Sequence, residues 1–126
     1  MNVLTAEWVA KAEGDYGSAL REMRDPQDSN YDASCYHSQQ SAEKYLKAYL
    51  QENNVAFPKI HDLRKLLRRC LRVDGSFSVP RSVVKQLDEY ELRFRYPGDD
   101  ATLVEAEAGY RAATQIRDVV RSKLGI

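Results

Sequence analysis

Apolar residues recur at every third or fourth position along most of the chain, and few stretches interrupt this repeat. That spacing places apolar side chains on one face of an α-helix, and no stretch alternates with the period of two expected of a half-buried strand. The interruptions are "RDPQDSN", "NNVAFPK", "VDGSFS" and "RYPGDD". Proline cannot continue a helix and glycine favours turns, so these breaks divide the chain into about five predicted helices.

Capping residues refine the helix bounds. We expect Thr5 to cap the first helix and Asp32 to cap the second, because their side-chain oxygens can accept hydrogen bonds from the first turn. Thr102 and Glu105 have the spacing of a capping box for the last helix. The second and last helices should be the longest, with shorter ones at about 61–72 and from Pro80 to about residue 95. The predicted fold is one all-α, up-and-down helical bundle covering residues 1–126.

Composition excludes several classes of function. The 126 residues carry 19 cations and 19 anions, so only local patches could attract nucleic acid. No apolar run is long enough for a membrane span, and no signal peptide is visible. Cys35 and Cys70 lack C-x-x-C spacing, so we expect reduced thiols and a cytoplasmic protein. Without E-x-x-H, H-E-x-x-H, a Cys/His cluster or a glycine-rich phosphate loop, we expect no metal and no cofactor.

The helix that contains "HSQQSAEKYLKAYL" carries a polar stripe opposite its apolar face. The stripe consists of His37, Gln40, Lys44 and Lys47 at helical spacing. It is either a solvated face, with a Glu43–Lys47 ion pair, or a surface that meets phosphate or a partner chain. Gln39 falls on the apolar side, where an unpaired amide is costly, so it should tie helices or a dimer together.

Two further stretches concentrate cations. In "KIHDLRKLLRRCLR", six cations face one acid, which predicts either a solvated helix or a patch for RNA or an acidic partner. His61 and Asp62 suit a capping pair, and an imidazole there could also transfer a proton near neutral pH. In "RFRYPGDD", Arg93, Arg95 and Tyr96 end a helix, where cations suit the macrodipole or could grip a phosphate and stack a base.

These pieces together resemble the HEPN domain family. The resemblance begins at Trp8, Ala12, Asp15 and Tyr16, is strongest at "QQSAEKYLKAYL", continues at "HDLRKLL" and returns at "RYP". It implies a helical bundle that often dimerises. It also implies a minimal nucleotidyltransferase protein as partner, frequently in a toxin–antitoxin pair.

The family's ribonuclease signature, an arginine and a later histidine with four to six residues between them, is missing. At those distances His37 follows Asn30, Tyr31 and Asp32, and His61 follows Asn54, Val55 and Ala56. The resemblance therefore implies nucleotide or RNA binding, or an accessory role, more than catalysis. Residues that match the family at its motif positions are Gln39 or Gln40, Lys44, Lys47, His61, Arg95 and Tyr96.

Three hypotheses follow from the sequence. The first is a homodimeric module that binds nucleotide or RNA, or works with a nucleotidyltransferase. The second is a metal-independent endoribonuclease with His37 or His61 as base. The third is a purely structural dimerisation module, with Gln39 and Gln40 at its interface. For the first, we expect one polyanion-binding surface formed by Lys44, Lys47, His61, Arg93, Arg95 and Tyr96.

Overall fold

The computed structural model describes residues 1–126 and contains five α-helices and no strand. The helices are α1 (Val3–Arg24), α2 (Tyr31–Glu52), α3 (Leu63–Val73), α4 (Arg81–Arg93) and α5 (Leu103–Leu124). The all-α class and the number of helices are as the apolar period predicts. Helices α2 and α5 are long, as predicted, but α1 is equally long. Each of the three has 22 residues.

The caps agree with the sequence prediction at α5 and differ from it at α1 and α2. Thr102 and Glu105 form the predicted capping box. At the other two helices the caps are Asn2 and Asn30, each two or three residues earlier than expected. Thr5 is instead buried, and its hydroxyl binds Asn2 and Glu52. Several Asn, Ser, Thr and Asp residues near a helix start compete for the cap, and tertiary contacts decide among them.

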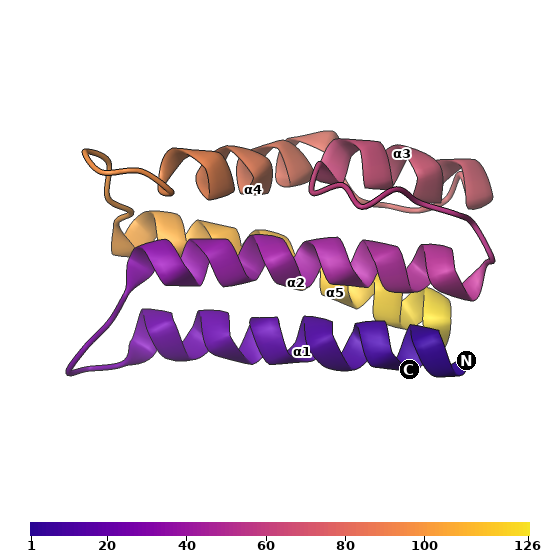
Figure 1. Cartoon of the computed structure of the whole chain (residues 1–126), viewed down its shortest axis with the longest axis horizontal. Coiled ribbons are helices and arrows are strands. Elements are labelled where there is room, and N and C mark those ends of the chain that lie inside the picture. The colour runs from indigo at the N-terminus through magenta and orange to yellow at the C-terminus, as the bar shows by residue number, and fades with distance from the viewer.

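Helix α2 lies at the centre of the bundle and contacts all four other helices (Figure 1). Helix α1 packs antiparallel to it through small residues, including the fully buried Ala12, Ala19 and Ala42. Two buried serine hydroxyls of α2 donate to α1 carbonyls: Ser41 to Ala12, and Ser34 to Ala19. These bonds give the buried hydroxyl groups hydrogen-bond partners, which close helix packing would otherwise leave unpaired.

Helix α3 departs from a strict up-and-down order. The loop at residues 53–62 runs back along α2, so α3 begins near the middle of α2 and runs in the same direction (Figure 1). Two contacts fix this direction: Gln39 binds the His61 carbonyl near the start of α3, and the Cys70 thiol points at the Leu46 carbonyl near its end. Asp62 caps α3 through the amides of residues 64 and 65.

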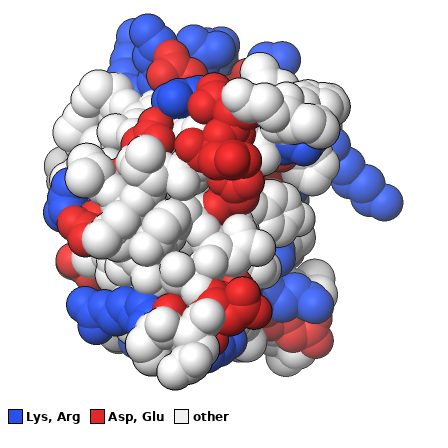
Figure 2. Space-filling model, turned by 90° about the vertical axis from the view of Figure 1, so that its left-hand side faces the viewer, with Lys and Arg blue, Asp and Glu red and all other residues white.

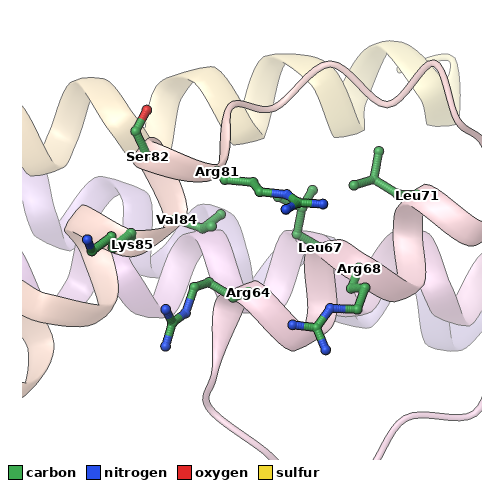
Figure 3. Close-up of a pocket in the computed structure, with 8 residues that line it drawn as sticks. All are labelled: Arg64, Leu67, Arg68, Leu71, Arg81, Ser82, Val84 and Lys85. Carbon is green, nitrogen blue, oxygen red and sulfur yellow. The ribbon is translucent and has the colours of Figure 1, made fainter.

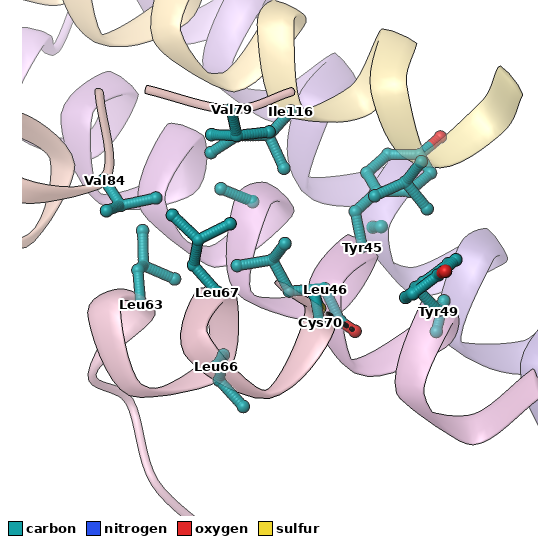
Figure 4. Packing of buried hydrophobic residues seen from close by; sticks show 14 of the residues in the cluster. Tyr45, Leu46, Tyr49, Leu63, Leu66, Leu67, Cys70, Val79, Val84 and Ile116 are labelled. Atoms are coloured by element: carbon teal, nitrogen blue, oxygen red, sulfur yellow. Dashed lines mark hydrogen bonds between the residues drawn. The ribbon is translucent and has the colours of Figure 1, made fainter. Parts of the chain in front are cut away.

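The main hydrophobic core lies where α2 meets α3, α4 and α5 (Figure 4). Leu46, Leu63, Leu66 and Ile116 are completely buried in it. Burying a side chain of this size contributes about 1.5–3 kcal/mol relative to leaving it exposed, so this cluster is the main source of stability. It also holds α2 rigidly beneath the loop that carries His61.

Candidate functional site on helix α2

The polar stripe of α2 lies between α1 and the loop at residues 53–62, and carboxylates hold its cations in place. Near the start of α2, Asp15 of α1 binds both His37 and Lys44. Its Oδ1 lies 2.8 Å from His37 Nδ1, and its Oδ2 lies 2.5 Å from Lys44 Nζ. All three side chains are mostly covered. A carboxylate favours the proton on Nδ1, which leaves Nε2 of His37 without a partner in the chain.

Glu43, which precedes Lys44 in the chain, organises a second cluster. This glutamate is 4% exposed, and its oxygens lie 3.1 Å from Lys47 Nζ and 3.0 Å from His61 Nδ1. Lys47 is also nearly buried, and its ammonium lies over the rings of Trp8 and Phe57. The expected Glu43–Lys47 pair therefore exists, but it is buried rather than on a solvated face.

His61 is the accessible member of this cluster. Its side chain is 74% exposed, while the carboxylate that orients it is buried. With Nδ1 engaged by Glu43, the Nε2 atom is available to a ligand. A carboxylate-oriented imidazole of this kind can donate a hydrogen bond to an anion or exchange a proton with it.

Gln39 anchors the His61 loop from below. This fully buried amide donates to the His61 carbonyl at 3.0 Å and to Asp88 of α4 at 3.4 Å, and its oxygen accepts from Gln40. Asp88 also accepts from the Leu63 amide. Burial raises the pKa of Asp88 to about 6, although the hydrogen bonds from Gln39 and Leu63 oppose the shift. Gln39 thus ties three segments of one chain together.

Of the three candidate binding residues in "RFRYPGDD", only Arg95 lies in a hollow beside α2. Arg95 lines a hollow of about 270 Å³ with Tyr36 of α2 and Tyr90 of α4, and it pairs with Glu91. The ring of Tyr36 lies against that of His37, with centroids 5.3 Å apart. Tyr36 therefore contacts both the hollow and the first cluster.

The other two candidates, Arg93 and Tyr96, lie elsewhere. Arg93 binds Asp99 at 2.6 Å and Glu105 at 2.7 Å, which secures the turn into α5. Tyr96 is 62% exposed and does not line the hollow. An end-on view of this part of the bundle shows acidic and basic side chains intermixed with wide uncharged areas (Figure 2). This end therefore carries no uniform positive field.

The structure thus groups the predicted residues without merging them into one cationic surface. Lys47 joins His61 through Glu43, and Lys44 joins His37 through Asp15. No local pattern in the sequence connects Glu43 to His61, 18 positions away. Helical spacing indicated the Glu43–Lys47 pair, but no local pattern links Asp15 to Lys44, 29 positions away.

Within the structure, no group of three or more His, Cys, Asp or Glu side chains is arranged to hold a metal ion. None of the helices combines the length and the apolar character needed to cross a bilayer.

Comparison with known proteins places this arrangement in a family. The model of the HEPN domain matches residues 5–123, which is almost the whole chain. The chain belongs to the HEPN domain family. No curated protein matches this HEPN domain significantly.

Two solved structures share its fold. The crystal structure of TT1696 from Thermus thermophilus matches with 24% identity and a TM-score of 0.75, covering 94% of this chain and 97% of that one. The crystal structure of ST0689, described as an archaeal HEPN homologue, matches with 21% identity and a TM-score of 0.70, covering 94% and 96%. At these identities the similarity concerns the fold alone.

Proposed function

We propose that this HEPN domain binds a phosphate-bearing ligand, a nucleotide or RNA, along the outward face of α2. The observation that carries the proposal is the exposed imidazole of His61, held by the buried Glu43 with Nε2 free. An oriented donor on a rigid support is what an anion-binding site requires, because little conformational freedom is lost on binding.

Arg95 supports a second contact for the same ligand. Residues 36 and 43 of α2, which meet Arg95 and His61 respectively, are separated by roughly 10 Å along the helix axis. A dinucleotide could span that distance. The guanidinium of Arg95 can fork onto a phosphate, and the exposed ring of Tyr36 offers a stacking face beside it. Lys44 and Lys47 contribute mainly by holding the carboxylates of Asp15 and Glu43 in place. Tyr96 contributes only at the edge of the site.

Binding of a labelled single-stranded RNA and of ATP across a salt series tests this proposal. His61→Ala and Arg95→Ala should each weaken binding, by about tenfold for loss of one charge-assisted contact. Arg111→Ala is the matched control, because Arg111 is exposed on α5 and makes no ion pair. Equal affinity in all three variants would refute a site on α2. Lys44 and Lys47 are poor test positions, since their loss leaves buried carboxylates unpaired.

We also propose that the domain is a homodimer and works with a minimal nucleotidyltransferase protein, as a toxin–antitoxin-like pair. The support is membership of the HEPN domain family, together with exposed apolar side chains such as Leu92 and Val104. Sedimentation equilibrium should give twice the 14.4 kDa chain mass at micromolar concentration. A neighbouring nucleotidyltransferase, co-expressed with the domain, should co-purify with it. The cytoplasmic location stays a prediction, supported by two buried free thiols.

One observation favours a second function, a metal-independent endoribonuclease. The Glu43–His61 pair resembles the carboxylate–histidine part of a general-base site, although the family's arginine–histidine spacing is absent. His37 with Asp15 is the alternative base, but its side chain is less exposed, at 29%. Incubation of RNA in EDTA with wild type, His61→Ala and His37→Ala decides this. Cleavage that only His61→Ala abolishes would support the enzyme, and intact RNA throughout would exclude it.

A further inference from the structure

A second cationic site lies on the opposite side of the His61 loop, where α3 meets the start of α4. It is a groove of about 460 Å³ whose rim carries Arg64 and Arg68 from α3 and Arg81 and Lys85 from α4. Figure 3 shows the Arg81 guanidinium reaching across toward Leu67 and Arg68. No carboxylate lines this groove. Four cations from two separate helices therefore line one hollow.

The chain supplies these cations with almost no counter-charge. Arg68, Arg81 and Lys85 are exposed and form no ion pair, and Arg64 only approaches Asp62 at 4.0 Å. Segment 59–85 contains eight cations and two acids. Of those acids, Asp62 caps α3 and Asp74 binds Lys123. The segment thus carries a net charge of +6 in a protein whose total is zero.

The cationic surface continues beyond the groove. A neighbouring hollow of about 280 Å³ shares Arg68 and is lined by Lys65, Arg69 and Arg72 as well as Pro58 and Ile60. Two adjoining hollows with one shared arginine form a track rather than an isolated point.

The lining indicates which ligand chemistry fits. Arginines form forked hydrogen bonds to phosphate, and most of the cations that line the two hollows are arginines: Arg64, Arg68, Arg69, Arg72 and Arg81. The floor consists of Leu67, which is 2% exposed, and the fully buried Val84, and the half-buried Leu71 also lines the groove. No aromatic ring lines either hollow, so a base would find no stacking platform.

We propose that the α3–α4 groove, lined by Arg64, Arg68, Arg81 and Lys85, is a phosphate-binding track for an RNA backbone or a nucleotide polyphosphate. The groove contacts the phosphates of the ligand and not its bases. Its affinity for RNA should therefore be independent of the RNA sequence and steeply dependent on salt. The site shares no residue with the α2 face. It therefore stands whether or not His61 and Arg95 bind a ligand.

The test compares three double variants with wild type: Arg68→Ala/Arg81→Ala in the groove, His61→Ala/Arg95→Ala on the α2 face, and Arg24→Ala/Arg111→Ala as the charge-matched control. Arg24 and Arg111 are exposed, make no ion pair and lie on α1 and α5. The probes are a fluorescein-labelled 20-nucleotide oligouridylate, a mixed-sequence RNA of the same length, and ATP. Circular dichroism and the urea midpoint should confirm that every variant is folded.

Loss of two phosphate contacts should lower the slope of log K against log[salt] by about 1.4 for a single strand. We expect this reduction in the groove variant and not in the control, together with at least a tenfold loss of affinity at low salt and equal binding of both RNA sequences. Binding of ATP but not RNA, lost in the same variant, would support the site with a nucleotide as its source of phosphate. Equal slopes in the groove and control variants would overturn the proposal.

A polyglutamate competitor separates phosphate from carboxylate recognition. If polyglutamate at equal charge concentration displaces the RNA as well as unlabelled RNA does, the groove recognises an acidic protein and the phosphate proposal is wrong. Loss of binding in the α2-face variant alone would likewise overturn this site while supporting the one on α2. The two proposals thus fail separately.

Discussion

Neutralising Glu43 should destabilise the HEPN domain more than neutralising any exposed acid. Glu43→Gln keeps the size and hydrogen-bonding atoms of the side chain but removes its charge. Lys47 then remains nearly buried without a carboxylate, since Glu43 is its only ion-pair partner. A charge left unpaired in a low-dielectric site is the costly outcome, whereas a mutual loss of both charges is often tolerated.

The expected magnitude follows from burial. Side-chain exposures of 4% for Glu43 and 7% for Lys47 place the pair in the buried class, where removing one partner costs about 3–5 kcal/mol. The rings of Trp8 and Phe57 beside the ammonium offset part of this cost, so we expect a value near 3 kcal/mol. With a urea m-value near 2 kcal/mol/M, the unfolding midpoint should fall by roughly 1.5 M.

Urea unfolding followed by circular dichroism measures this effect in a double-mutant cycle. Glu43→Gln and Lys47→Met should each be strongly destabilising, and the double variant should recover most of the loss. Glu89→Gln is the control, because Glu89 is exposed on α4 without an ion-pair partner, and it should change stability by less than about 0.5 kcal/mol. Additive single effects, or a Glu43→Gln variant as stable as Glu89→Gln, would refute the reasoning.

Three further predictions concern other buried groups and one cap. Burial raises the folded-state pKa of Asp88 to about 6, so the native state holds a proton that the unfolded state releases, and Asp88 should reduce stability as pH rises from about 4 to 6. The free energy of unfolding of wild type should therefore fall relative to that of Asp88→Asn across this pH range. A difference that does not change with pH would contradict the prediction. Burial raises the pKa of the Cys35 and Cys70 thiols to about 12, so neither should react with a thiol reagent at pH 8 until urea exposes both. Thr102→Ala should cost about 1 kcal/mol by removing the α5 cap, whereas Thr102→Ser should retain it.

Local chemistry in the sequence determined the helices. The period of apolar residues predicts five of them, and proline and glycine mark their ends, because both effects act within one or two turns. The capping box at Thr102 and the ion pair of Glu43 with Lys47 are local in the same sense. The HEPN resemblance also rests on short stretches in a fixed order, and the family model confirms it.

Only the tertiary structure decided which charges are free. The stripe of α2 looks exposed on a single helix, but α1 supplies Asp15 to hold His37 and Lys44. On α3, by contrast, no carboxylate from another helix reaches the cations of the groove, so the segment that sequence reasoning left open as a solvated face keeps an unopposed charge. Coulomb interactions depend on distance in space, and residues far apart in the chain set that distance only when the helices pack.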